Sequence, residues 1–146
     1  MENTIAQMSV CKRLNRMLLF GHSFIPSTPF YHIFDIDMIE KTPPASQLYL
    51  QFSKNNLDII EHMQLNHIPF ALSISNITEL IYAAALDAKY IIVKKETAKT
   101  AQEIAENYLF DAKILVHIDS ESDIEEMALL GIDGVLFPEA IIKVSS

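Results

Sequence analysis

Several residue types that small proteins use for cross-links and for charge are scarce in this chain. Its 146 residues include a single cysteine, Cys11, and no tryptophan. One thiol can form neither an internal disulfide nor a cysteine-rich zinc site, and this usage favours a reducing, cytoplasmic location. Basic residues are also few, because 11 lysines and arginines face 19 acidic residues, which gives a formal net charge of −8. Nucleic-acid binding depends on clustered cations, so we expect no nucleic-acid partner.

Long apolar runs are scarce near the start of the chain. The longest uninterrupted run there is Met17–Phe20, which is too short for the core of a signal peptide or for a membrane span. We therefore expect no membrane partner. The chain does have a globular composition, with 50% hydrophobic and 21% charged residues, and its length suits one domain covering residues 1–146.

The first thirty residues divide into an expected helix and an expected linker. Thr4 and Gln7 have the spacing of a capping box, and apolar residues follow at helical spacing. This pattern predicts an N-terminal helix over residues 1–21, ending at a glycine. Residues 22–30 contain two prolines and predict a linker, which leaves residues 31–146 as the core.

The core alternates between apolar strand patterns and helical patterns. From residue 47 onward a strand pattern begins about every 22 residues, and most gaps hold apolar residues spaced as on one helix face. Strands that alternate with helices predict right-handed crossovers and a parallel sheet in an α/β fold. The expected strands are residues 31–37, 47–52, 70–75, 90–94, 113–118 and 134–137. The expected helix caps are Ser53, Asn76 with Glu79, and Ser122 with Glu125.

The strand and helix units also repeat in pairs. A shift of 44 residues places Phe70–Lys94 over Ile114–Pro138, so that Ser73 coincides with His117. At about 22 residues per unit the chain holds six strands at most, whereas a closed barrel of eight strands normally needs roughly 200 residues or more. We therefore expect an open twisted sheet or a half-barrel-like sheet, whose exposed edges a homodimer would cover.

The repeating unit of strand, polar tip, capped helix and buried strand resembles (βα)8-barrel sequences. Residues 76–144 are similar to the first half of the glycerol-uptake antiterminator family, through NITELIYAAALDAKYIIV, ILVHID and DGVLFPEAIIK. In barrels of this kind the late strands usually bind phosphate, through glycine-rich loops and a helix N-terminus. The chain departs from that pattern, because it has only three glycines, which are too few for glycine-rich loops. They are Gly21, Gly131 and Gly134. The family's phosphate site therefore has no matching residues here.

A second resemblance implies catalysis. The segment YHIFDIDMIE is similar to the first motif of haloacid-dehalogenase-type phosphatases, an apolar strand that ends in Asp-x-Asp. The resemblance implies that Asp35 is the nucleophile and Asp37 the general acid, with Mg²⁺ held by Asp35 and Asp119. The remaining motifs match Ser75 with Asn76, Lys94 or Lys95, and Ser120 with Asp123.

The match to the phosphatase motifs is incomplete at two places. Met38 and Ile39 stand where the family has Gly-Thr or Gly-Val after its first motif. Ile118 stands where a glycine normally precedes the aspartate of the fourth motif. These departures put the catalytic interpretation in doubt.

Polar residues at the expected strand ends form the candidate site, because parallel α/β folds bind ligands there. Residues i and i+2 share a strand face, so Asp35 is expected to point with Asp37, and His117 with Asp119. Such groups bind divalent cations or perform general acid–base chemistry. Polar residues at strand ends also commonly cap the next helix, and this alternative applies to Asp119. The candidate ligand-binding residues are Ser73, Ser75, Lys94, Lys95, His117 and Asp119, and other strand ends carry Gln51, Ser53 and Glu139.

Three functions remain open from the sequence. A regular scaffold with incomplete catalytic motifs favours binding of a small anionic ligand, or of a protein partner, without catalysis. The alternative is a Mg²⁺-dependent phosphohydrolase, which requires the strand of Asp35 to lie beside those of Ser75 and Asp119. A third interpretation is a Schiff-base lyase that uses Lys94, whose amine would then need to be desolvated.

Overall fold

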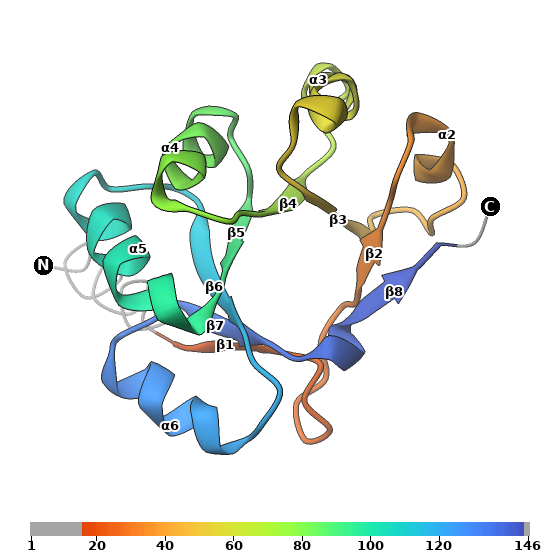
Figure 1. Cartoon of the computed structure of the whole chain (residues 1–146). Helices are drawn as coiled ribbons and strands as arrows, with labels where there is room; N and C mark the ends of the chain where they lie inside the picture. Colours follow the sequence, from red (N-terminus) through yellow and green to blue (C-terminus); the bar gives the residue numbers. More distant parts are fainter. Residues whose placement is uncertain (1–15, 145–146) are drawn as a thin grey trace, which may run out of the picture.

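Parallel strands alternate with helices throughout the structure, a computed structural model that describes residues 16–144 (Figure 1). No helix within this range is long and apolar enough to cross a membrane. The strands are β1 (Leu18–Phe20), β2 (Phe30–His32), β3 (Gln47–Gln51), β4 (Phe70–Ser73), β5 (Tyr90–Val93), β6 (Lys113–His117), β7 (Gly134–Leu136) and β8 (Ile141–Lys143). The helices are α2 (Ile36–Ile39), α3 (Leu57–Leu65), α4 (Ile77–Ala85), α5 (Lys95–Asn107) and α6 (Ser122–Leu129), with short 3₁₀ helices η1 (Lys54–Asn56) and η2 (Pro138–Ala140).

One sheet contains all the described strands, in the order β1-β7-β6-β5-β4-β3-β2-β8, and every neighbouring pair is parallel. From β2 to β7, neighbours in the sheet are also neighbours in the chain, which is the order expected of a half-barrel. The sheet curls, and the helices lie around its outer face (Figure 1). The predicted α/β fold of repeated βα units with a half-barrel-like parallel sheet is therefore confirmed.

The prediction of at most six strands is wrong, because β1 and β8 extend the sheet at its two edges. β1 falls within the helix expected over residues 1–21, and the first 15 residues of that expected helix lie outside the described part of the chain. β8 follows η2, beyond the last expected strand. Each of these two strands has three residues, and so short an apolar run fits a helical turn as well as a strand.

The two edge strands bear on the expected homodimer. That expectation rested on apolar edges that need cover, and short edge strands are themselves one way in which proteins limit edge-to-edge pairing. On β8, Ile142 is the one large hydrophobic residue whose side chain is exposed, at 41%. The homodimer therefore stays a prediction, and the short edge strands β1 and β8 give it little support.

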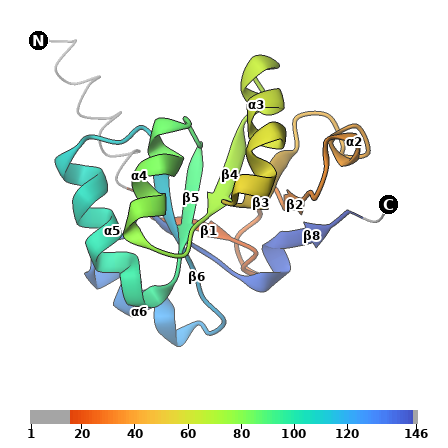
Figure 2. The same ribbon diagram turned by 45° about the horizontal axis from the view of Figure 1, so that its top comes forward.

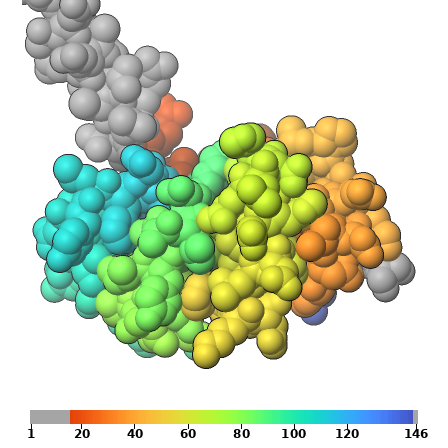
Figure 3. Space-filling view, turned by 90° about the horizontal axis from the view of Figure 1, so that it is seen from above, coloured from red at the N-terminus to blue at the C-terminus, as the bar shows by residue number. Residues whose placement is uncertain are grey.

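Alternation along the strands gives the sheet two apolar faces. Outward residues, such as Leu72 on β4 and Val116 on β6, pack with the helices in the larger cluster. Inward residues form a second cluster to which every described strand contributes, for example Ala71 on β4 and Leu115 on β6. Side chains thus fill the inside of the curled sheet, as in a small barrel. Figure 2 shows the curled sheet and its helices tilted, and in Figure 3 the segments of α2, α3, α4 and α5 lie side by side across the visible surface.

The turns that lead from α3, α4, α5 and α6 back to the sheet share one conformation. The N–H of Ile68 donates to the carbonyl of Met63 at 2.8 Å, and the same five-residue bond recurs after each of the other three helices. This is the Schellman motif, which places one left-handed residue just after the helix. These turns lie at the amino end of the sheet. Because the same turn follows each of these helices, the repeat seen in the sequence is also present in the structure. The left-handed residues are His67 (φ 56°), Asp87 (φ 64°), Leu109 (φ 54°) and Gly131 (φ 73°).

Two glycines permit close approaches that join β1 to the rest of the fold. Gly134 pairs with Leu18, and a Cβ on Gly134 would lie 2.7 Å from the Leu18 Cβ and 2.8 Å from the Leu115 Cδ2. Gly21 follows β1 with a φ of 85°, and a Cβ there would lie 2.8 Å from the backbone nitrogen of Ala140 in η2. Such distances are far inside van der Waals contact. Both positions therefore require glycine where β1 and η2 complete the inside of the curled sheet.

Candidate functional site

Six polar side chains stand on the inward face of the sheet at the carboxyl ends of its strands. Five of them are the last residues of their strands, and each follows a residue of the inner cluster by two positions, as His117 follows Leu115. The sixth, Lys94, follows β5 with an extended backbone, so it continues the alternation from Ile92. We call these six residues the polar collar: His32, Gln51, Ser73, Lys94, His117 and Lys143.

The strand register brings the collar residues together in pairs. Neighbouring strands in a sheet lie about 4.8 Å apart, so two side chains at the same level and on the same face can contact one small group. The pairs are Gln51 with Ser73, His32 with Lys143 and, one step beyond the pairing of Val93 with Val116, Lys94 with His117.

The collar side chains make no hydrogen bond or ion pair with one another or with any other residue in the range 16–144. Gln51 and Lys94 accept hydrogen bonds from side chains only through their backbone carbonyls. Every buried side-chain nitrogen or oxygen in the described range has a hydrogen-bond partner. The partly buried His32, Ser73 and His117 must therefore expose their polar atoms to solvent. The collar thus presents unused hydrogen-bonding groups above an apolar floor.

Outside the collar, polar side chains at the carboxyl end stabilise the starts of helices. The Ser53 hydroxyl accepts a backbone N–H of η1 at 3.0 Å, and the Asn76 side chain accepts the N–H of Glu79 at 2.9 Å. These two expected caps are confirmed. The cap expected at Ser122 is wrong, because Ser122 is the first residue of α6 and its own N–H donates to the Ser120 hydroxyl.

Three of the predicted ligand-binding residues lie outside the collar. The N–H of Ser75 donates to the Glu79 carboxylate at 2.8 Å. Lys95 begins α5, where its ammonium lies 2.8 Å from the Asp123 carboxylate. The hydrogen bond that Lys95 donates to the Asp123 carboxylate is the main cause of the raised pKa of Lys95. Asp119 is exposed in the loop between β6 and α6. The structure thus brings Ser73, Lys94 and His117 into the collar and leaves Ser75, Lys95 and Asp119 in loops or at a helix start.

The expected strand over residues 31–37 ends at His32, so the predicted Asp-x-Asp strand end is wrong. Asp35 is instead the N-cap of α2, and its carboxylate accepts the N–H of Met38 at 2.9 Å. Asp37 lies in the first turn of the same helix. Acidic side chains at these positions cap free backbone N–H groups and favour the positive end of the helix dipole. Sequence spacing alone could not separate this helix start from a strand end.

The strand order separates the residues on which the phosphatase interpretation depends. β2, which precedes Asp35, and β6, which precedes Asp119, have β3, β4 and β5 between them. Within residues 16–144, no group of three histidine, cysteine or acidic side chains is placed to hold a metal ion. The assignment of Mg²⁺ to Asp35 and Asp119 therefore lacks the neighbouring strands that it requires.

Lys94 does not have the surroundings of a Schiff-base lysine. Its side chain is exposed at the start of α5. A reactive amine needs burial or a neighbouring cation to lower its pKa. An exposed lysine at the collar is better suited to attracting and binding an anion.

Three collar residues were not among the predicted binding residues: His32, Gln51 and Lys143. His32 and Lys143 end strands of three residues, whose limits the sequence pattern does not mark. Gln51 stood at an expected strand end. Side chains alternate along a strand, so the leucines at 48 and 50 on the helix-covered face could have identified Gln51 as inward.

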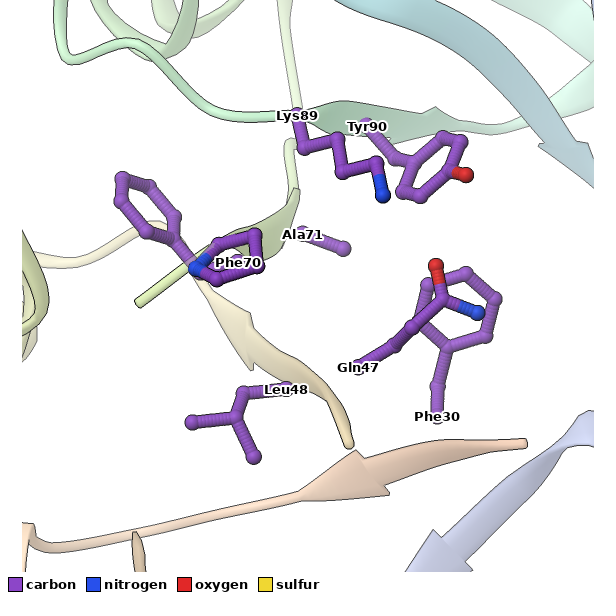
Figure 4. Close-up of a pocket in the computed structure, with 8 residues that line it drawn as sticks. Phe30, Gln47, Leu48, Phe70, Ala71, Lys89 and Tyr90 are labelled. Atoms are coloured by element: carbon purple, nitrogen blue, oxygen red, sulfur yellow. The ribbon is translucent and has the colours of Figure 1, made fainter. Parts of the chain in front are cut away.

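The amino ends of the strands enclose a crevice that is too small for a ligand (Figure 4). Phe30, Gln47 and Tyr90 line it together with Lys89, whose Nζ lies 5.4 Å from the centre of the Tyr90 ring. The crevice has no room for a water molecule. Burial raises the pKa of Tyr90. The inside of the sheet is therefore packed at this end, whereas its carboxyl end carries the unpaired side chains of the collar.

A comparison of the chain with protein-family models and with curated proteins finds no match. The candidate function therefore rests on the residues of the collar themselves.

Proposed function

We propose that this chain binds a small anionic ligand at the polar collar and does so without catalysis. The observation that carries this proposal is the set of six inward polar side chains that have no protein partner within residues 16–144. Buried and partly buried polar groups normally find partners inside a protein. Six unpaired polar side chains at the carboxyl ends of neighbouring parallel strands are the arrangement expected of a binding site.

The sign of the ligand follows from the residue types. The collar contains two lysines, two histidines, one serine and one glutamine, and it contains no carboxylate. The chain as a whole is acidic, with a formal net charge of −8. Basic residues without carboxylates at one end of the sheet favour anions there, a local preference that the total charge does not give. A phosphate or carboxylate group is the matching ligand chemistry.

Two of the collar pairs have separate tasks in this proposal. Lys94 supplies a positive charge, and His117 beside it supplies an imidazole N–H. The Ser73 hydroxyl and the Gln51 amide donate hydrogen bonds without adding charge, which gives the site directional contacts. The apolar floor below them limits the access of water and so strengthens each polar contact.

Titration of the full chain with inorganic phosphate tests the proposal. Lys94→Gln and His117→Gln should each weaken phosphate binding by about tenfold, because each removes one charge-assisted or direct hydrogen bond. The matched control is Lys99→Gln, which removes the same charge from an exposed position on α5. Binding constants come from chemical-shift changes of the backbone amides at constant ionic strength.

Two outcomes would count against the proposal. Equal phosphate affinity in the wild type, Lys94→Gln and Lys99→Gln would show that any binding is a general effect of charge. Turnover of a phosphate monoester that disappears in Lys94→Gln or His117→Gln would replace simple binding by catalysis.

A further inference from the structure

The last residues of β2 and β8 form a pair of basic residues to which the proposal above gives no separate task. β8 lies beside β2 at the edge of the sheet, and its register places Lys143 directly opposite His32. Both residues are on the inward face, two positions after Phe30 and Ile141 of the inner cluster. No carboxylate within residues 16–144 forms an ion pair with Lys143. Among the described residues, no carboxylate therefore offsets the charge of Lys143.

Aromatic neighbours fix the position of the His32 ring. The Tyr49 ring on β3 meets it edge to face at 4.9 Å between centres, and the Phe34 ring lies 4.3 Å away at a tilt of 31°. Both ring nitrogens of His32 remain without a hydrogen bond to any residue in the range 16–144 and reach solvent, as shown above. A ring that is held from the sides, with its nitrogens open, is arranged to contact something outside the protein.

The electrostatics of His32 support the same conclusion. Burial lowers the pKa of its imidazole, and the charge of Lys143 lowers it further. The titratable groups that face the ring are Lys143 from β8 and the Tyr49 phenol from β3. An anion bound between His32 and Lys143 would offset both causes, because it supplies the negative charge that the pair lacks.

We propose that His32 and Lys143 form a second anion subsite, which takes one phosphate or carboxylate group beside the exposed ring of Phe34. The Lys143 ammonium supplies a fixed positive charge, and protonated His32 donates a hydrogen bond to one oxygen of the anion. Anion binding and proton uptake by His32 are then coupled. This subsite uses residues of β2 and β8, so it stands or falls independently of Lys94 and His117.

The test follows the ring signals of the histidines in the full chain by NMR while the pH is varied. Sodium phosphate, sodium acetate and sodium chloride are compared at equal ionic strength, so that phosphate and carboxylate are told apart. We expect phosphate or acetate, but not chloride, to raise the pKa of His32. In Lys143→Gln the pKa of His32 should rise without any ligand, and the further rise with the anion should shrink. Lys99→Gln is the matched charge control and should behave as the wild type.

The outcomes separate this inference from the proposed function. If Lys94→Gln abolishes the response of His117 to phosphate but leaves that of His32, both sites exist. If His32 titrates identically in phosphate, acetate and chloride, the second subsite is refuted, whatever His117 does. An anion effect on His32 that is unchanged in Lys143→Gln would also refute it. Lys143 is exposed at the edge of the sheet, so its substitution should not prevent folding.

Discussion

The two ends of the curled sheet use the same inward face in opposite ways. At the amino end, the rings of Phe30 and Tyr90 meet edge to face at 5.5 Å between centres, and the crevice that they line has no room for water. Both rings also contact the ring of Phe20, which ends β1. At the carboxyl end, one strand length away, the six collar side chains have no partner among the described residues. The difference teaches that close packing and unpaired polar side chains are concentrated at opposite ends, as in closed barrels.

The largest effect is expected where the aromatic cluster is broken. Phe30 is fully buried, and Phe30→Ala should lower the free energy of unfolding by about 3–5 kcal/mol, because it removes a core ring and leaves a cavity. Urea unfolding followed by circular dichroism measures this change.

A collar substitution provides the contrast for this prediction. Ser73→Ala removes a hydroxyl that has no partner within residues 16–144, so it should change the free energy of unfolding by less than about 0.5 kcal/mol. If Ser73→Ala were as destabilising as Phe30→Ala, the collar would be part of the packing, and the contrast between the two ends would be lost.

A smaller loss is expected where β1 approaches β7. Gly134→Ala should lower the free energy of unfolding by about 1–3 kcal/mol, because the added Cβ overlaps Leu18 and Leu115. The control is Gly131→Ala, which meets nothing within 4 Å but has a positive φ of 73°, and should cost about 1–2 kcal/mol through backbone strain alone.

The strand contact distinguishes these two glycine variants. Hydrogen exchange of the β1 amides should speed up in Gly134→Ala more than in Gly131→Ala, since only the first moves β1 away from β7. Equal protection of β1 in the two variants would mean that the close approach at Gly134 can relax without cost.

The sequence was sufficient for the fold class and for part of the site. Strand patterns recur about every 22 residues, and the helical segments between them have apolar residues on one face. Both patterns depend on local burial, which repeats along the chain, so the parallel half-barrel-like sheet was predictable. The strands of Ser73 and His117 were long enough to show where they end. By contrast, β2 and β8 have three residues each. The strand expected over residues 31–37 was placed with the wrong end, and β8 was not expected, because its place in the sheet comes from long-range pairing that no local pattern records. The pair of His32 and Lys143 was missed for that reason.

A gain of stability is expected at a turn of the amino end. Leu109 is 84% exposed and has a φ of 54°, a conformation that costs a side chain with a Cβ about 1–2 kcal/mol. Leu109→Gly should raise the free energy of unfolding by about 0.5–1 kcal/mol, after the extra flexibility of glycine in the unfolded chain is subtracted. Asp87→Gly, at the same place in the preceding unit, should gain less, because aspartate tolerates this conformation better. A loss of stability in Leu109→Gly would show that its exposed side chain has a packing role.

The smallest effect is the dependence of stability on pH at the collar. The pKa of His32 is lowered in the folded chain by burial and then by Lys143, so the unfolded chain takes up this proton at a higher pH than the folded one. His32 therefore contributes its full stabilisation above the unfolded value near 6.5, and this contribution is lost as the pH falls from there through the folded pKa. Lys143→Gln removes the second cause of the lowered pKa, so it should flatten the fall of unfolding free energy between pH 7 and pH 5. His32→Gln removes the titrating group, so it should flatten this fall further. Urea unfolding across this range compares both variants with the wild type. An unchanged slope in His32→Gln would mean that groups elsewhere govern this titration.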